Sequence, residues 1–466
     1  MRIAFLTIFT IFAHAIASDE KKIVCYFGSW AVYREGNGRI SIPDIDPTLC
    51  THLVYTFVGL TNDGQVRVID PWGDLSPSEP GGSKDGFNLF NRLRRRSPNT
   101  KTLLAIGGWN EGSGKFSSVA GDPLKRRAFA DNLLGFVRSY GFDGLDLDWE
   151  YPNQRGGIEA DRDNFVLLLR ELRLRFSKAG LLLTAAVGAS KHLASLSYRI
   201  KDVMENLDFV SLMAYDFHGP WEAKTGLNAP LYASSWEKGD DRLLNVNASV
   251  HYWLEEGAPA HKLVLGVPFY ARTFTLADPN DNKIGASISG PGKAGPYTKQ
   301  DGSMGYNELC EKMSKETWRI EFDDEQRVPY AVKGNQWIGF DNPRSIREKA
   351  ELVNALGLGG AMLWSIETDD FRGICGSQYV LLKTLNHELR GGEPPENGEH
   401  TDACELECTE PGFMRNPDNC AIYYLCIASA EQGYQKIPLK CPEGQVFDLL
   451  SKSCDWPVNV NCTNCK

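Results

Sequence analysis

The chain of 466 residues has no excess of positive charge, and this absence narrows the classes of partner it could bind. Its 50 Lys and Arg residues are outnumbered by 60 Asp and Glu residues, which gives a net charge of −10. A basic surface is what attracts nucleic acid or an anionic membrane. We therefore expect neither of these partners, and a neutral substrate fits the charge better.

Long apolar runs are also absent, apart from the first residues of the chain. The segment MRIAFLTIFTIFAHAIAS has one Arg, an apolar run from Ile3 to Ala13 and small residues at Ala15 and Ala17. This is the pattern of a secretory signal peptide cleaved near Ala17. The alternative, a membrane anchor, would need a longer run to cross a bilayer. We expect residues 1–17 to be removed and the mature protein to be soluble and extracellular.

Cysteine is scarce over most of the chain and crowded at its end. Four of the twelve cysteines precede residue 390, and the other eight lie between Cys404 and Cys465. In an oxidising compartment this indicates a large domain with a few disulfides, followed by a small domain that depends on them. Zinc is the alternative for clustered cysteines, but tandem CxxC pairs are missing and His400 is the only nearby His. We expect no metal and no cofactor.

Eight short apolar, β-branched segments recur along the large domain, and helix-like segments separate most of them. Two predicted helices are 126–141 and 161–180, the second capped by Asp161 and closed by Gly180. Buried strands that alternate with helices indicate a parallel sheet covered on both faces. Eight such units predict an α/β fold, the (β/α)₈ TIM barrel. The strands are expected at 22–28, 51–58, 102–108, 144–148, 181–188, 207–215, 262–270 and 360–367.

The connection between the seventh and eighth strands is much longer than the others. Residues 271–341 are rich in Gly, Pro, Tyr and charge, and a structureless loop of that length is rare. We predict a small α+β insertion there, over the mouth of the barrel. Residues 391–403 are polar, with Pro and Gly, as is typical of a linker. The predicted organisation is therefore a signal peptide at 1–17, a barrel domain at 18–390 and a disulfide-rich β module at 404–466.

The stretch GFDGLDLDWEYP, residues 141–152, alternates acidic and apolar side chains with the period of a strand. In a barrel the apolar set would pack outward against helices, while Asp146, Asp148 and Glu150 would line the interior. Glu150 would lie last, at the carboxyl end where barrel enzymes keep their active sites. Ionising all of these crowded carboxyls would cost much free energy, so the pKa of at least one of them must rise. A raised pKa keeps a carboxyl protonated near neutral pH, as a general acid requires. The alternatives are a solvated acidic face or a calcium loop, but calcium loops place Gly and Asn between their ligands.

DGLDLDWEYP closely resembles the DxxDxDxE signature of family 18 glycoside hydrolases, the chitinases. The resemblance covers nearly all of residues 22–390 and implies hydrolysis with retention, in which the acetamido group of the substrate is the nucleophile. Glu150 would protonate the glycosidic oxygen and later activate water. Asp148 would orient the acetamide N–H, Asp146 would share a proton with it as a coupled pair, and Asp143 would give structural support. Further matching stretches are VCYFGSW (24–30), THLVYTFVG (51–59), LLAIGGWN (103–110), LMAYDFHGPWE (212–222), GVPFYARTFTL (266–276) and GGAMLWSIETDDF (359–371).

The same resemblance assigns roles around the −1 sugar, the one whose bond is cut. Tyr215 would donate its hydroxyl to the acetamide carbonyl and fix the geometry of attack. Asp216 would bind hydroxyls of that sugar, and Met213 would line the acetamide pocket. Arg272 and its neighbour Tyr270 would also contact the sugar.

Aromatic side chains complete the expected cleft, because the apolar faces of pyranose rings stack on indoles. Trp364 would floor the −1 subsite, and Trp30, Trp109 and Trp221 would lie along the cleft. For any single Trp, core packing is the alternative. The remaining expected substrate contacts are Tyr26, Phe57, Gly108, Tyr151 and Met362.

Residues 408–462 resemble the peritrophin-A type of chitin-binding module in their cysteine spacing and in the stretches YYLC, CPEGQVF and CDWP. Tyr424 and Trp456 are expected to stack on sugar rings, whereas Phe413, Tyr423 and Phe447 are expected to pack inside the module. A weak binder tethered to an enzyme raises its local concentration on a solid polymer. The pairings that the two resemblances imply are Cys25–Cys50, Cys310–Cys375, Cys408–Cys426, Cys420–Cys462 and Cys441–Cys454, with Cys404 and Cys465 left open.

The sequence thus predicts a secreted, endo-acting chitinase that acts as a monomer on chitin and chitooligosaccharides. Two alternatives remain: a chitin-binding lectin without activity, and an endo-β-N-acetylglucosaminidase that trims N-glycans. The presence of Glu150 argues against the first, and the chitin-binding tail argues against the second. Asn247 lies in an N-glycosylation sequon, and a second sequon at Asn461 is disfavoured by the cysteine within it.

Overall fold

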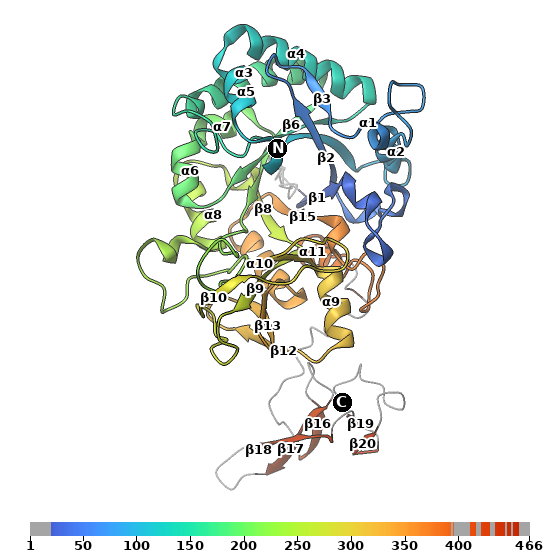
Figure 1. Cartoon of the computed structure of the whole chain (residues 1–466), viewed down its shortest axis with the longest axis vertical. Helices are drawn as coiled ribbons and strands as arrows, with labels where there is room; N and C mark the ends of the chain where they lie inside the picture. The colour runs from blue at the N-terminus through green and yellow to red at the C-terminus, as the bar shows by residue number, and fades with distance from the viewer. Residues whose placement is uncertain are drawn as a thin grey trace, which may run out of the picture.

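The fold is taken from a computed structural model, shown in Figure 1. In the parts of the chain that it describes, no helix combines the length and the apolarity needed to cross a membrane. The signal peptide predicted for residues 1–17 lies outside the described residues. These residues are 20–392, 395, 411–415, 421–428, 434–442, 445–448 and 451–455.

Eight parallel strands close into a barrel, as the sequence predicts. The strand order is β1-β15-β8-β7-β6-β5-β4-β2, and β2 pairs back with β1 to complete the ring. The short β3 (Val66–Val68), antiparallel to β2, extends the sheet beyond the ring. The barrel strands are β1 (Lys22–Gly28), β2 (His52–Leu60), β4 (Lys101–Gly107), β5 (Gly144–Asp148), β6 (Leu182–Gly188), β7 (Phe209–Met213), β8 (Leu263–Pro268) and β15 (Gly360–Trp364).

Helices cover the outside of the barrel, and their apolar faces form one large core with the outward side chains of the strands. Trp149 illustrates this packing: its indole stacks on Phe116 of α3 at 5.3 Å between ring centroids and meets Phe165 of α5 edge-on at 5.9 Å. In Figure 1, α3, α4 and α5 lie together on one side of the barrel. The longer covering helices are α3 (Gly114–Gly121), α4 (Pro123–Tyr140), α5 (Asp161–Ala179), α8 (Val246–Glu255), α10 (Pro343–Ala355) and α11 (Val380–Arg390), with the shorter α1 (Pro71–Asp74), α2 (Gly86–Arg92), α6 (Lys191–Ser197) and α7 (Ile200–Asn206).

One predicted helix cap is wrong. Helix α5 begins at Asp161 itself, and the preceding residue, Ala160, makes no side-chain cap. The buried Asp161 carboxylate instead accepts from the N–H of Ile158, at 2.8 Å, and from the Ser117 hydroxyl of α3, at 2.9 Å. The acid therefore ties the loop before the helix to a neighbouring helix. The predicted stop is confirmed, because Gly180 follows α5 in the left-handed conformation that glycine adopts without strain.

The long connection between the seventh and eighth barrel strands folds as the predicted α+β insertion. Its antiparallel sheet has the order β10-β9-β14-β13-β12, with β11 paired to β9. Strand β9 starts two residues after β8 ends, so its first residues stay at the carboxyl end of the barrel. The elements are β9 (Tyr270–Leu276), β10 (Ile288–Pro291), β11 (Ser303–Gly305), α9 (Tyr306–Lys315), β12 (Arg319–Asp323), β13 (Val328–Lys333) and β14 (Gln336–Gly339).

The C-terminal module consists of short antiparallel strands. Inside it, the rings of Tyr423 and Phe447 lie parallel at 3.8 Å, and Phe413 packs on Phe447 at 5.4 Å. The strands are β16 (Gly412–Arg415), β17 (Ile422–Ala428), β18 (Tyr434–Lys440), β19 (Val446–Asp448) and β20 (Ser453–Asp455).

Disulfides join Cys25 to Cys50, Cys310 to Cys375 and Cys441 to Cys454. These are three of the five expected pairings. Each of the other two includes cysteines outside the described residues, as do Cys404 and Cys465. Among the described residues, one group has metal-ligand geometry, Cys310, Asp370 and Cys375, but both sulfurs of this group are joined in a disulfide.

Candidate active site

The carboxyl end of β5 presents the acids of the central stretch to the interior of the barrel. Asp146 and Asp148 are buried, at 1% and 3% exposure. Leu145 and Leu147 belong instead to the outer core between strands and helices. The alternation read from the sequence therefore places each side chain on the expected face, because successive residues of a strand point to opposite sides.

Asp146 is the deeper acid, and neighbouring strands satisfy both of its oxygens. The Tyr26 hydroxyl of β1 donates to one oxygen at 2.5 Å, and the Thr184 hydroxyl of β6 donates to the other. Burial raises the pKa of Tyr26 well above its usual value, with the charges of Asp146 and Asp148 adding to the effect. Tyr26 therefore stays a hydrogen-bond donor to Asp146.

Asp148 shares its surroundings with Asp146. Its carboxyl hydrogen-bonds to that of Asp146, and it accepts from the N–H of Ala186 on β6 at 3.3 Å. Burial raises its pKa well above the usual range, and the charges of Asp146 and then Glu150 raise it further. Two buried carboxyls in hydrogen-bond contact are costly to ionise together, so this environment favours the protonated form of Asp148.

Glu150 lies just past the end of β5, half-buried at the mouth of the barrel. Burial is the main cause that raises its pKa to about 7, and the charge of Asp216 acts in the same direction. A hydrogen bond from Tyr151 and the charge of Arg155 oppose this rise. Glu150 is thus protonated in a substantial fraction of molecules near neutral pH, as a proton donor to a leaving group must be.

The loop after β7 and the start of β9 build a second polar group around Asp216. Its carboxylate accepts from the Tyr270 hydroxyl and from Arg272, each at 2.7 Å. The Asp216 N–H donates to the Oδ1 of Asn228 at 2.9 Å, and the Nδ2 of Asn228 donates to the Tyr270 carbonyl at 3.1 Å. Asn228 was missed by the sequence analysis, because no motif marks it. Its place becomes visible only when the loop after β7 is folded against β9.

Tyr215 stands between these two groups. Its ring meets that of Tyr270 edge-on at 6.0 Å, and its hydroxyl lies 3.9 Å from the sulfur of Met362. Burial is the main cause that raises the pKa of Tyr215 well above its usual value. Electrostatic repulsion from Tyr270, Asp216 and Glu150 raises it further. The hydroxyl therefore remains protonated and able to donate. Met362 and Met213 belong to the apolar cluster inside the barrel, beneath this tyrosine.

Four aromatic side chains from β1, β2, β15 and the turn after β1 form a cluster of ring contacts around Trp364, and Tyr26 in this cluster is buried. Trp364 lies 5.8 Å from Tyr26, 5.9 Å from Phe57 and 6.2 Å from Trp30 between ring centroids. The ring of Trp30 also stacks on Phe57 at 6.3 Å. The predicted set is thus brought together, with Trp364 half-buried and Trp30 reaching solvent.

Two further predicted tryptophans, Trp109 and Trp221, are the most exposed of this set, each at 58%. Each has an arginine over its ring: Arg155 at 3.5 Å from the centre of Trp109, and Arg272 at 5.1 Å from that of Trp221. Neither is a core residue, so the core-packing alternative does not apply to them.

Gly108 is needed for close packing at the end of β4. Its N–H donates to the Asp148 carbonyl at 2.9 Å, and a Cβ added there would come within 2.7 Å of the Phe57 ring. Its φ of 81° also favours glycine.

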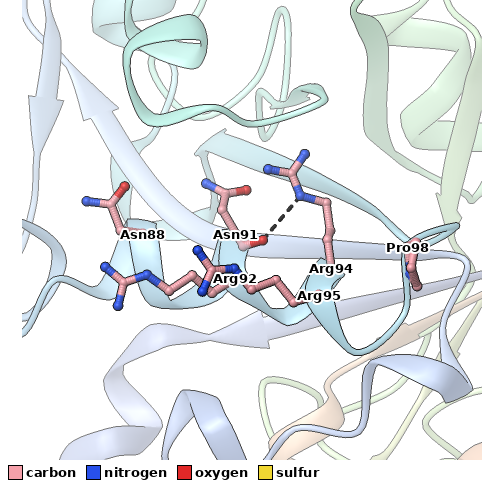
Figure 2. A pocket seen from close by; sticks show the side chains of 6 residues that line it. All are labelled: Asn88, Asn91, Arg92, Arg94, Arg95 and Pro98. Carbon is pink, nitrogen blue, oxygen red and sulfur yellow. Dashed lines mark hydrogen bonds between the residues drawn. The ribbon is translucent and has the colours of Figure 1, made fainter.

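Asp143, the first acid of the stretch, lies away from the other three. Its carboxylate pairs with Arg94 at 2.8 Å and accepts from the Thr102 N–H at 2.8 Å, so it joins the amino ends of β4 and β5. Arg94 also donates to the Asn91 carbonyl in the hollow drawn in Figure 2. That hollow is lined by none of the predicted site residues but by Asn88, Asn91, Arg92, Arg94, Arg95 and Pro98.

In the C-terminal module, Tyr424 lies on the central strand β17, partly exposed, while Trp456 falls outside the described residues. Asn247, the glycosylation candidate, is partly exposed at the start of α8.

Comparisons with known proteins agree with this architecture. Residues 22–369 match the family described as Glycosyl hydrolases family 18, and residues 404–462 match the Chitin binding Peritrophin-A domain. The chain is 39% identical to mouse Chitotriosidase-1 over 93% of this chain and 95% of the relative, and 44% identical to Probable chitinase 2 of Drosophila melanogaster over 82% and 84%. It resembles the crystal structure of Ostrinia furnacalis Group IV chitinase in complex with allosamidin, with a TM-score of 0.77, 45% identity, and coverage of 80% of this chain and all of that one. The chain therefore belongs to the family 18 glycosyl hydrolases, as an enzyme of the chitinase type with a C-terminal peritrophin-A chitin-binding domain.

Proposed function

We propose that this enzyme hydrolyses the β-1,4 bonds between N-acetylglucosamine units of chitin and chitooligosaccharides, with the acetamido group of the substrate as nucleophile. The observation that carries the proposal is the state of Glu150: a carboxyl at the barrel mouth whose pKa is raised to about 7, near the buried and hydrogen-bonded carboxyls of Asp146 and Asp148. This arrangement supplies one general acid and no free carboxylate nucleophile.

In the first step Glu150 donates its proton to the glycosidic oxygen, and the bond between that oxygen and C1 breaks. The acetamido carbonyl oxygen of the −1 sugar attacks C1 and forms an oxazolinium ion. In the second step the ionised Glu150 takes a proton from water, and the water oxygen attacks C1. The bond between C1 and the acetamido oxygen breaks, so the oxazolinium ring opens and the acetamido group is restored. Two displacements at C1 leave its configuration retained, and Glu150 is protonated again for the next cycle.

Asp148 and Tyr215 are proposed to hold the acetamide during attack. The oxazolinium ion carries positive charge on the former amide group, and a carboxylate at Asp148 stabilises that charge through the N–H. Asp146, held by Tyr26 and Thr184, is proposed to be the hydrogen-bond partner of Asp148 during this step. The Tyr215 hydroxyl donates to the acetamide carbonyl and keeps its oxygen in line with C1.

The remaining side chains are proposed to position the sugars. Trp364 supports the apolar face of the −1 ring, and Asp216, held by Tyr270 and Arg272, binds its hydroxyls. Trp30 and Trp109 are exposed tryptophans on two other loops. A cleft with aromatic surfaces on more than one loop suits internal cleavage of a long chain, so we infer an endo-acting enzyme.

Hydrolysis of N-glycans is the second candidate for a barrel with these acids, and substrate comparison tests it. We expect the enzyme to cut chitotetraose and to release no oligosaccharide from a high-mannose glycoprotein under the same conditions. Chromatography of the products measures both rates. Release from the glycoprotein at a rate equal to or above that from chitotetraose would reject the proposed substrate, and binding to both without cleavage would favour a lectin.

We propose that the C-terminal module binds chitin through Tyr424 and Trp456, and that the protein is secreted. Replacing both residues with Ala in the full chain should lower adsorption to insoluble chitin roughly two- to tenfold, because stacking on sugar rings is lost. Hydrolysis of chitotetraose should not change. The control is Ile427→Ala, an exposed residue of β17 whose position has the opposite strand parity to Tyr424. Unchanged adsorption of the double variant would remove these two residues from the binding role.

Several other assignments stay predictions. They are the monomeric state, glycosylation at Asn247, removal of residues 1–17, and the boundaries of the linker at 391–403.

A further inference from the structure

We propose that Arg155 is a positioning residue for the reaction. It holds the Trp109 side chain and its loop against the loop that carries Glu150, so that the two loops move together. The inference rests on the proposed function of the cleft. No motif in the sequence analysis marked Arg155, which lies in the loop between β5 and α5.

The contacts of the Arg155 side chain reach two loops at once. Its Nη1 donates to the backbone carbonyl of Trp109 at 2.7 Å and to that of Glu150 at 3.0 Å. One nitrogen therefore joins Trp109, in the loop after β4, to Glu150, in the loop after β5. Hydrogen bonds from a charged donor are among the stronger ones in proteins.

The same guanidinium covers the indole of Trp109, with 3.5 Å from its central carbon to the ring centre. Trp109 nevertheless remains 58% exposed, so the arginine supports the ring without enclosing it. An exposed tryptophan on a loop loses rotational freedom when it stacks on a sugar. A cation held over its ring removes part of that freedom beforehand, which lowers the entropic cost of binding.

The backbone of Arg155 contributes to the same junction through Ser113, at the end of the loop after β4. The Ser113 N–H donates to the Arg155 carbonyl at 3.3 Å, and its hydroxyl donates to the Tyr151 carbonyl at 2.8 Å. The Trp149 indole N–H donates in turn to the Ser113 hydroxyl at 3.0 Å. Each loop thus donates to carbonyls of the other, and Arg155 has φ of 52°, in the left-handed region, at this crossing.

Arg155 is also the positive side chain whose charge acts on Glu150 from this loop. Other titratable groups also interact electrostatically with the Glu150 carboxyl. They are Asp148, Tyr151, Tyr198, Tyr215 and Asp216. Since a positive charge favours the ionised carboxylate, removing it should raise the pKa of Glu150. The basic limb of the pH profile then moves to higher pH, an effect that loss of a structural contact alone would not produce.

The test uses the full chain with Arg155→Gln and Arg155→Lys, assayed on chitotetraose from pH 5 to 9. We expect Arg155→Gln to lower kcat/KM about tenfold, mainly through KM, because hydrogen bonds to two carbonyls and the ring contact are lost. Its basic limb should move to higher pH. Arg155→Lys keeps the charge but not the planar fork, so it should restore the limb and leave KM raised.

A double-mutant cycle with Trp109→Ala tests the coupling. Adding Arg155→Gln to Trp109→Ala should cost clearly less than Arg155→Gln costs alone, because part of its effect passes through the indole. The matched control is Arg344→Gln, since Arg344 stacks on Phe322 at 3.6 Å in the insertion region and should leave all kinetic constants unchanged. Full additivity, or an Arg155→Gln enzyme with the parent's KM and pH profile, would overturn the proposal. Neither result bears on Glu150 as the catalytic acid. That role would be rejected only if Glu150→Gln kept the hydrolysis rate of the parent enzyme.

Discussion

The variant Glu150→Gln is expected to lose hydrolysis of chitotetraose by roughly 10²- to 10⁴-fold in kcat, the usual contribution of a general acid and base. Glutamine has nearly the shape of the protonated carboxyl and can still donate a hydrogen bond, but it cannot transfer a proton. Binding of chitooligosaccharide should therefore persist, since the aromatic surface around Trp364 and the Asp216 group are unchanged. Steady-state kinetics and calorimetric binding separate the two effects.

The same residue fixes the pH dependence of the parent enzyme. Because the donor must be protonated and burial raises its pKa to about 7, kcat/KM should fall as the pH rises through about 7. At its ordinary value of 4.5, Glu150 would already be ionised and the decline would lie near that value. The residual activity of Glu150→Gln should lack this limb.

A matched control for this variant is Glu348→Gln on α10. Burial also raises the pKa of Glu348, but the residue lies among Arg327 and Arg344, outside the cleft. We expect its kcat and pH profile to match those of the parent. If Glu150→Gln kept the parent rate while remaining folded, Glu150 could not be the proton donor and the assignment of the acid would be wrong.

The second large effect concerns the substrate: bonds should be cut only where the sugar on the non-reducing side carries an N-acetyl group at C2. The physical reason is the state of the remaining acids. Asp146 and Asp148 are buried, hydrogen-bonded to each other and fixed from β1 and β6. Asp216 is bound by Tyr270 and Arg272. No carboxylate among these is left to attack C1, so a sugar without the acetamide has no nucleophile.

Most of the barrel could be predicted from the sequence, and the one wrong helix cap has a physical explanation. The eight apolar segments identify the strands, because a strand buried on both faces needs nearly continuous apolar residues. The period of two in the acidic stretch placed Asp146 and Asp148 inside and Trp149 outside. The predicted cap at Asp161 was wrong, because the pattern of an acid before an apolar run does not tell whether its carboxylate turns to the helix or to a neighbouring segment.

The site could be predicted only as far as local motifs carry it. Thr184 and Asn228 hold Asp146 and Asp216, but they come from a neighbouring strand and a distant loop, and their role follows from strand register and loop packing. Thr184 had a partial signal, since it occupies an inward position of a predicted strand. Arg155 had none, because its contacts depend on two loops crossing at the mouth of the barrel.

The most direct test of the account is the identity of the sugar at each new reducing end when the enzyme digests chitosan that is partly N-acetylated. Proton NMR distinguishes N-acetylglucosamine from glucosamine at that position during the digestion. Substrate-assisted hydrolysis predicts that the new reducing ends are N-acetylated throughout, however few such sugars the polymer contains. Glucosamine at the new reducing ends, accumulating in proportion to its share of the polymer, would show that the acetamide is not the nucleophile.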